Sequence, residues 1–344
     1  MQNAFGRLDE LPRVRLGHSP TPMDHMANLS AEFGVELYVK RDDCTGLAFG
    51  GNKVRQLEYY FGEAKAQGAD TVLITGARQS NFVRTAAAAA RLFSMTCHIQ
   101  LEERVTRDDP LYRTSGNVLL DRLLGATLHS YPEGEDEAGA DRRLREIADD
   151  LTGQGRRPYI IPLAPGHAPL GALGYLNAAA EILDDMKARD LTFDRVVLAS
   201  GSGNTHAGLL FGLRALGSAL PVTGVCVRRA ADLQVPRLAA RCQEIADFLE
   251  MPSPVSDADI EVTDAFLAPG YGRLNPATAD ALTRAAQSES LILDPVYTAK
   301  TMAGFLDLAS KAGDGETMLF VHTGGTPAVF AYGDDLVENC ASGG

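Results

Sequence analysis

Short apolar runs alternate with longer stretches of helical period along most of this chain. Runs such as Val196-Val197-Leu198-Ala199 are apolar at every position, which is typical of a strand whose sheet is covered by helices on both faces. The alternation of strands and helices predicts βαβ units and mainly parallel sheets. The expected strands are Glu36–Lys40, Thr71–Thr75, Cys97–Leu101, Thr127–Tyr131, Tyr159–Pro162, Arg195–Ser200, Val222–Val227 and Met318–Thr323, and the expected helices are 52–67, 80–92, 141–152, 170–187, 205–216, 233–249, 276–288 and 298–312.

Two loops rich in proline and glycine, at residues 163–169 and 266–272, have the composition of boundaries between structural units. A chain of 344 residues is long enough for two domains. We expect a large α/β domain of residues 1–54 and 166–344, with a smaller α/β domain of residues 55–165 inserted into it. A small ligand is expected to bind in the cleft between them, at the carboxyl ends of the parallel strands.

Composition and charge exclude several classes of function. The formal net charge of −13 disfavours nucleic acid and anionic membranes as partners. The longest apolar runs fall short of the roughly 18 residues that a membrane span needs, and residues 1–7 lack the apolar core of a secretory signal, so a cytoplasmic protein is expected. The five cysteines show no CxxC spacing and the seven histidines no HExxH pattern, so we expect neither a disulfide framework nor a metal site.

The segment Gly50-Gly51-Asn52-Lys53 places one lysine at the expected start of a helix, behind two glycines. Glycine lets the backbone approach a bound group closely, and a helix N-terminus offers free N–H donors and positive potential. That potential and partial burial lower the pKa of a lysine, which favours the free amine that forms a Schiff base. The alternative is a surface lysine that follows a turn.

The segment 200–205, Ser-Gly-Ser-Gly-Asn-Thr, follows an expected strand and opens an expected helix. A strand, a glycine-rich turn and a helix N-terminus together form a cradle for a phosphate, although an ordinary turn also favours small residues. After another strand, Ser80 is well placed as a helix N-cap, and its hydroxyl and the amide of Asn81 are expected to face the same cleft.

A Schiff-base lysine and a phosphate cradle in one two-domain α/β fold suggest pyridoxal phosphate. The chain resembles the pyridoxal-phosphate enzymes of the tryptophan-synthase-β fold (fold type II), in the branch that holds D-cysteine desulfhydrase and 1-aminocyclopropane-1-carboxylate deaminase. This resemblance implies two three-layer αβα domains with mainly parallel sheets. Its motifs run in family order over nearly the whole chain: 40–43 (KRDD), 50–53 (GGNK), 79–81 (QSN), 170–175 (LGALGY), 205–208 (THAG), 268–272 (APGYG), 293–297 (LDPVY) and 322–325 (HTGG).

The resemblance implies a role in cofactor binding for several positions. Lys53 matches the lysine that forms the Schiff base, and Asn81 matches the residue that is hydrogen-bonded to the phenolic oxygen of the cofactor. Thr323 matches the partner of the pyridine nitrogen. The phosphate loop corresponds to Gly201, Ser202, Gly203, Asn204 and Thr205.

For the substrate, the resemblance implies that Ser80 contacts the carboxylate or moves a proton, with Asn81 and Gln79 beside it. Tyr271 and Tyr297 match active-site tyrosines near the ring and the substrate. Arg78 is expected to supply a cation for an anionic substrate, with a solvated surface arginine as the alternative. The assembly expected is a homodimer that acts on a small amino acid.

Two positions bear on the reaction. At these two motifs cyclopropane deaminases have the sequences DPVYE and HLGG. This chain has Thr298 in place of the glutamate and Thr323 in place of the leucine. Without a glutamate the pyridine nitrogen has no acidic partner, so the ring is a weaker electron sink, and prompt expulsion of a β leaving group suits that arrangement. Phe82 departs from the QSNH that family members commonly show, and this difference removes an imidazole from the predicted cleft.

The reaction expected is therefore α,β-elimination by a carbon–sulfur lyase, which releases pyruvate and ammonium with sulfide from D-cysteine or sulfite from L-cysteate. The segments 40–48 and 116–121 resemble the cysteate sulfo-lyases more, which gives a slight lean to cysteate. A deaminase or racemase of another small amino acid, such as 1-aminocyclopropane-1-carboxylate, is the enzyme alternative. A small-molecule binding protein on the same fold is the alternative without chemistry.

Overall fold

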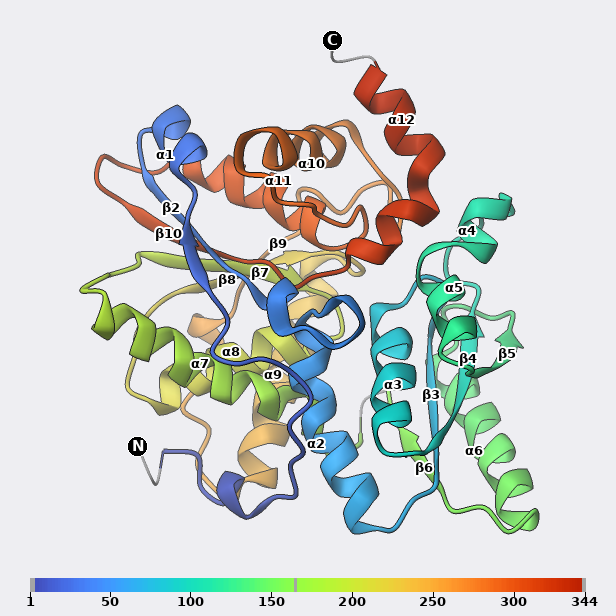
Figure 1. Ribbon diagram of the computed structural model, residues 1–344. Helices are drawn as coiled ribbons and strands as arrows, with labels where there is room; N and C mark the ends of the chain where they lie inside the picture. The colour runs from blue at the N-terminus through green and yellow to red at the C-terminus, as the bar shows by residue number, and fades with distance from the viewer. Residues whose placement is uncertain (1–3, 164–165, 342–344) are drawn as a thin grey trace.

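The computed structural model describes residues 4–163 and 166–341, and within them the strands form one six-stranded and one four-stranded sheet (Figure 1). The six-stranded sheet has the order β1-β2-β10-β7-β8-β9, in which only the β1–β2 pair is antiparallel. The four-stranded sheet has the order β5-β4-β3-β6 and is parallel throughout. The strands are β1 (Met23–His25), β2 (Glu36–Lys40), β3 (Thr71–Ala77), β4 (Thr96–Glu102), β5 (Thr127–Tyr131), β6 (Pro158–Ile161), β7 (Arg195–Ser200), β8 (Val222–Cys226), β9 (Glu261–Thr263) and β10 (Thr317–Val321).

Helices cover both faces of the six-stranded sheet, with α1, α10 and α11 on one side and α7, α8 and α9 on the other (Figure 1). The helices are α1 (Ala27–Phe33), α2 (Asn52–Ala66), α3 (Asn81–Leu92), α4 (Pro110–Thr114), α5 (Gly116–Leu123), α6 (Glu137–Gly153), α7 (Leu170–Ala188), α8 (Asn204–Ala215), α9 (Ala231–Phe248), α10 (Pro276–Glu289), α11 (Thr298–Ala309) and α12 (Gly333–Ala341). Short 3-10 helices lie at Leu8–Glu10, Asp42–Thr45, Leu47–Phe49, Asp257–Asp259 and Thr326–Tyr332.

Successive strand residues supply different hydrophobic clusters, as a sheet with two covered faces requires. In β7, Val196 and Leu198 pack into the cluster that includes α7 and α8, while Val197 packs with α11 on the opposite face. In β3 of the smaller sheet, Val72 joins the cluster that includes α3, and Leu73 packs against α6. Both sheets are therefore the middle layer of a three-layer αβα arrangement, which confirms the expected fold class.

Most of the expected strands and helices are present, and most of their ends lie within a few residues of the expected positions. The differences lie in short elements: β1 and β9 have three residues each, and α1, α4, α5 and α12 were not expected. The four-stranded sheet uses residues 71–161, but the proposed domain limits at 54/55 and 165/166 stay predictions, and Ala164 and Pro165 lie outside the described residues. None of the described helices is both long and apolar enough to cross a membrane.

Candidate active site

A cavity lies where the carboxyl ends of the strands of both sheets meet. Its walls come from the last residues of β3 and β7, from the segments that follow β3, β4, β6, β7, β8 and β10, from the start of α2, and from the loops that carry Tyr271 and Tyr297. This is the place where open parallel sheets present their loops to a ligand. The lining residues are Asn52, Lys53, Gln56, Thr75, Gly76, Ala77, Ser80, Asn81, Phe82, Arg104, Leu163, Ala199, Gly201, Ser202, Gly203, Asn204, Thr205, Arg228, Tyr271, Tyr297, Thr323 and Gly324.

Lys53 is the second residue of α2, and its side chain is partly exposed toward this cavity. Its Nζ donates to Oε1 of Gln56 at 3.3 Å and lies 5.4 Å from the centroid of the Phe82 ring. The surrounding side chains exclude water, and this desolvation lowers the pKa of the Lys53 ammonium to about 8. A larger share of free amine is therefore present near neutral pH than for an ordinary lysine, as formation of a Schiff base requires.

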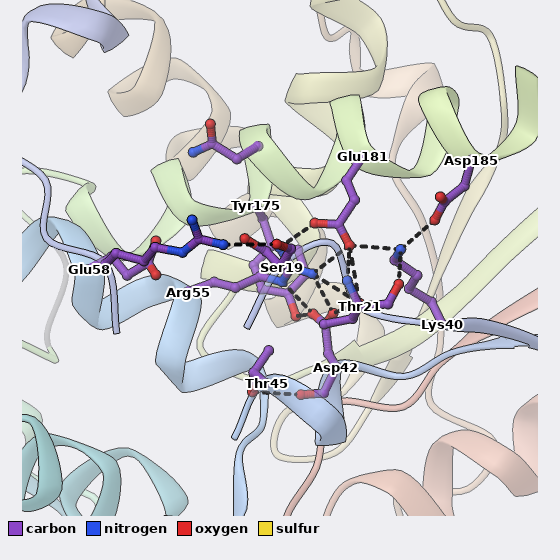
Figure 2. A network of polar contacts seen from close by, with 12 residues as sticks. Ser19, Thr21, Lys40, Asp42, Thr45, Arg55, Glu58, Tyr175, Glu181 and Asp185 are labelled. Atoms are coloured by element: carbon purple, nitrogen blue, oxygen red, sulfur yellow. Dashed lines mark hydrogen bonds and ion pairs between the residues drawn. The ribbon is translucent and has the colours of Figure 1, made fainter. Parts of the chain in front are cut away.

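A buried network of charges anchors the segment that leads to Lys53 (Figure 2). Arg55, also in α2, donates to both carboxylate oxygens of Asp42, at 2.8 and 3.0 Å, and to Glu181 at 2.9 Å. The backbone oxygen of Asp42 accepts from the N–H of Gly51 at 3.0 Å, so the network holds the turn immediately before Lys53. Lys40 closes the far side of the network through Glu181.

The expected phosphate loop surrounds the N-terminus of α8. Gly203 is the N-cap residue with φ of +100°, in the left-handed region that favours glycine, and within the described residues no side chain caps this helix end. The hydroxyl oxygen of Thr205 accepts from Asn52 at 2.8 Å and from Gln56 at 2.9 Å, which ties this loop to α2. An uncapped helix N-terminus that faces a cavity offers N–H donors and positive potential to an anion.

The segment after β3 contributes Ser80 and Asn81 to the cavity. Ser80 is the N-cap of α3, where its Oγ accepts from the N–H of Phe82 at 3.2 Å. Gln79 is buried and does not line the cavity, because its side chain donates to the carbonyl of Tyr112 at 2.7 Å and accepts from the N–H of Asn117 at 2.9 Å. Gln79 is thus occupied in holding residues 112–117 against this segment.

The two expected tyrosines meet in the cavity wall. The hydroxyls of Tyr271 and Tyr297 are hydrogen-bonded to each other, and their rings are 5.9 Å apart in an edge-to-face arrangement. Burial raises the pKa of both hydroxyls, so both stay protonated near neutral pH. One proton forms the bond between the two hydroxyls, which leaves the other hydroxyl free to donate to a bound group. Thr323 also lines the cavity, whereas Thr298 lies outside the lining and donates to Asp294 at 2.8 Å.

Arg78 does not line the cavity, and its guanidinium pairs with Glu103. Two other arginines that were not expected at the site, Arg104 and Arg228, do line it, with side chains 5% and 7% exposed. Arg104 pairs with Glu102 at 2.6 Å, and Arg228 pairs with Glu137 at 2.8 Å.

Each of these two arginines comes two residues after a strand, β8 for Arg228 and β4 for Arg104. Attention to the residues that follow expected strands could therefore have found both. Among the described residues that line the cavity none is acidic, so the charged side chains of its lining are Lys53 and the two arginines, whose charge is offset in part by Glu102 and Glu137. The loop, the lysine and this charge fit pyridoxal phosphate, an anion with an aldehyde.

Comparison with known proteins agrees with this fit. Residues 14–324 match the model of the family described as "Pyridoxal-phosphate dependent enzyme". The chain belongs to this family. It is 41% identical over 327 residues to a D-cysteine desulfhydrase of Salmonella schwarzengrund (strain CVM19633), covering 94% of this chain and 97% of the relative, and 41% identical over 328 residues to the D-cysteine desulfhydrase of Yersinia pestis (strain Pestoides F), covering 95% and 97%.

Solved structures agree at the level of the fold. A structure described as an ACC deaminase homologue is 37% identical, with a TM-score of 0.87, and covers 98% of this chain and 99% of its own. O-ureido-L-serine synthase, at 20% identity and a TM-score of 0.67, shares the fold. The expected branch of the family, the cofactor pyridoxal phosphate and a lyase are confirmed, so the binding-protein alternative is not retained. These relatives do not support the lean toward cysteate.

Proposed function

We propose that this enzyme is a carbon–sulfur lyase that eliminates a sulfur substituent from the β-carbon of a cysteine-type amino acid and releases pyruvate and ammonium. The observation that carries the proposal is the meeting of Lys53, the loop 201–205 and Thr323 around one cavity without an acidic lining residue in the described chain. The 41% identity to D-cysteine desulfhydrases supports the proposal that the bond broken is a carbon–sulfur bond. When bound, pyridoxal phosphate supplies an electron sink for the negative charge at Cα.

We assign the cofactor's binding to residues that line the cavity. The N–H groups of the loop 201–205 would hold the phosphate, Lys53 would hold the aldehyde carbon, Thr323 would bind the pyridine nitrogen, and Asn81 would donate to the phenolic oxygen; all of these residues line the cavity. The hydroxyl of Thr323 would bond to a neutral pyridine nitrogen but would hardly keep it protonated, so the cofactor would withdraw charge from Cα less strongly, which suits prompt loss of the β substituent.

The proton at Cα passes to a base that lines the cavity, Lys53 or Ser80, depending on the configuration of the substrate. With a pKa of about 8, the Lys53 amine both accepts and returns a proton near neutral pH. The substrate carboxylate lies at Ser80 and Asn81. Tyr271 and Tyr297 are held protonated by burial and share one hydrogen bond, so one of the two hydroxyls remains to donate to the departing group or the substrate.

The test is an assay of pyruvate, sulfide and sulfite release from D-cysteine, L-cysteine, L-cysteate and 1-aminocyclopropane-1-carboxylate. We expect pyruvate in equal amount with sulfide or sulfite from at least one cysteine-type substrate. A keto acid from the cyclopropane substrate alone, with no sulfur product from the other three, would overturn the proposal and favour the deaminase alternative. The homodimer and the cytoplasmic location stay predictions.

One observation favours L-cysteate as a second candidate substrate. Its sulfonate stays charged, and holding an unpaired anion in a closed cleft is costly. Arg104 and Arg228 both line the cavity and are nearly buried, and the Nε of Arg228 is buried without a hydrogen-bond partner in the described chain. Arginine is the side chain best suited to pairing such an anion.

If cysteate is the substrate, Arg228→Gln should raise KM for cysteate far more than KM for D-cysteine, whose thiol needs no cation. Arg78→Gln is the matched control, because Arg78 pairs with Glu103 outside the cavity lining. An equal loss for both substrates in Arg228→Gln would assign this arginine to structure or to the cofactor and remove the support for cysteate. Equal effects of the two variants on cysteate would do the same.

A further inference from the structure

The side-chain amide of Asn81 has a defined orientation. Its Oδ1 accepts from Nδ2 of Asn117 at 2.9 Å and from a guanidinium nitrogen of Arg84 at 3.4 Å. The oxygen end of an amide only accepts and the nitrogen end only donates, so the hydrogen-bond partners decide which end faces which way. With the oxygen held by two donors, the Nδ2 of Asn81 is the end that remains for the cavity, which Asn81 lines.

The orientation of Asn117 is set in turn by Arg84. The Oδ1 of Asn117 accepts from Nε of Arg84 at 3.1 Å, and its Nδ2 also donates to the backbone oxygen of Gln79 at 3.0 Å. Arginine carries five donors and no acceptor, so Asn117 must turn its oxygen toward Arg84. Arg84 at the oxygen end and the carbonyl of Gln79 at the nitrogen end therefore fix the same orientation of Asn117, in which its nitrogen donates to Asn81.

Arg84 is placed to keep this direction fixed. It is fully buried in α3 and also donates to the carbonyls of Ala48 and Gly50, in the turn that precedes Lys53. Burial lowers the pKa of Arg84 to about 10, and the charge of Asp121 opposes this, so Arg84 stays a pure donor near neutral pH. Within the described residues both carboxylate oxygens of Asp121 are buried without a hydrogen bond.

We propose that Arg84 and Asn117 are positioning residues that form a one-way hydrogen-bond relay, which presents the Nδ2 of Asn81, rather than its oxygen, to the phenolic oxygen of the cofactor. The proposal rests on the assignment of Asn81 to that oxygen in the proposed function. Its consequence is that the cofactor meets a donor whose polarity is set by Asn117 and Arg84, on the side of Asn81 that faces away from the cofactor. A donor there stabilises the anionic form of the phenolic oxygen.

The deciding variant is Asn117→Asp, which keeps the shape of the side chain but leaves it only acceptors. The new carboxylate still accepts from Arg84, now as an ion pair, which favours folding. It cannot donate to Asn81, so the Asn81 amide turns over to donate to it, gives up the long 3.4 Å bond from Arg84, and presents its oxygen to the cofactor. We expect the dissociation constant for pyridoxal phosphate, measured by equilibrium dialysis, to rise roughly tenfold to a hundredfold. The pH at which the visible absorption of the bound cofactor changes should move upward.

Two controls separate polarity from a merely structural role. Asn117→Leu removes the bonds of Asn117 without reversing them, so its effect on the cofactor should be smaller than that of Asn117→Asp. Asn177→Asp, in α7, makes the same change from amide to carboxylate at a side chain that donates to Tyr59 and not to Asn81. This variant should leave cofactor affinity unchanged. If Asn117→Asp matches the wild type in affinity and pH profile, or if Asn117→Leu is the more damaging variant, the relay is refuted.

A second pair of variants carries the test if Asn117→Asp does not fold. Arg84→Lys keeps a side chain with donors only, whereas Arg84→Met removes them. We expect Arg84→Lys to keep most of the cofactor affinity that Arg84→Met loses. Equal losses of affinity in the two variants would refute the relay. These measurements need no substrate, so failure of the relay and failure of the proposed carbon–sulfur lyase activity are distinguishable.

Discussion

Lys53 and Arg55 lie two residues apart on α2 and end in opposite surroundings. Arg55 is buried against two carboxylates, those of Asp42 and Glu181, which accept four of its hydrogen bonds. Lys53 faces the cavity, where its neighbours are the Gln56 amide and the Phe82 ring and where no described lining residue is acidic.

The difference shows how one helix supplies both a fixed frame and a reactive group. Saturation with carboxylates makes Arg55 a permanent cation that fixes the turn before Lys53. The lack of a carboxylate partner lets desolvation alone act on Lys53, which lowers its pKa to about 8. The reactivity of Lys53 thus depends on which groups its surroundings omit as much as on which they contain.

The largest effect is expected where the reactive group itself is removed. Lys53→Ala should lower the rate of pyruvate release by roughly 10⁴-fold or more, because the residue that holds the cofactor and moves protons is lost. Thermal unfolding should change little, since Lys53 has no ion-pair partner among the described residues to leave unpaired. Lys65→Ala, at an exposed lysine of the same helix, is the control and should retain activity. Pyruvate release at the wild-type rate by Lys53→Ala would remove Lys53 from the mechanism.

Removal of Arg55, the arginine paired with two carboxylates, should instead affect stability. Arg55→Met leaves Asp42 and Glu181 buried without their main partner, which should lower the free energy of unfolding in urea by about 3–5 kcal/mol. Arg15→Met, at an exposed arginine that donates to the carbonyl of Ser19, should change it by about 0.5 kcal/mol or less. A similar small change in both variants would show that the buried network does not stabilise the fold.

The phosphate loop offers a test of cofactor binding, with a second glycine of positive φ near α8 as the matched control. Gly203→Val places a β-branched residue at a φ of +100°, which strains the N-terminus of α8 and should weaken binding of pyridoxal phosphate roughly tenfold. Gly217→Val imposes the same kind of strain at φ +79° beyond the other end of α8, with no atom near its new Cβ. It should lower stability but leave cofactor affinity unchanged, and equal affinity losses in both variants would argue against a phosphate site at 201–205.

The smallest effect concerns acid stability. Burial raises the pKa of Glu181, but its hydrogen bonds and charge pairing with Arg55 and Lys40 outweigh this and lower the pKa to about 2, from an ordinary 4.5. A carboxylate with a lowered pKa in the folded state contributes stability that is present above its unfolded pKa and is lost as the pH falls toward the folded one. The window is therefore between pH 4.5 and pH 2.

Urea unfolding across this window provides the measurement. In Glu181→Gln the free energy of unfolding should fall less steeply with decreasing pH than in the wild type. Asp184→Asn, at an exposed carboxylate on the same helix, should leave the slope unchanged. Equal slopes in Glu181→Gln and the wild type would mean that Glu181 is not held ionised by the network.

The sequence by itself determined the elements and the parts of the site that are local. The apolar strands, the N-cap at Ser80 and the glycine-rich loop before α8 depend on periodicity and turn chemistry within a few residues, and the structure has them where they were expected. The three-residue strands β1 and β9 were missed because so short a segment has no period of its own and forms only by pairing with a longer neighbour.

Only the tertiary structure decided which charges are paired and which face the cavity. Arg78 and Arg104 both lie near the ends of strands in the same sheet, but one pairs with Glu103 away from the cavity and the other lines it. Arg55 meets Glu181 across 126 positions of the chain. The orientation of the Asn81 amide depends on a bond to Asn117, 36 positions away. Such choices follow from distances and directions between side chains, which residue order along a chain does not contain.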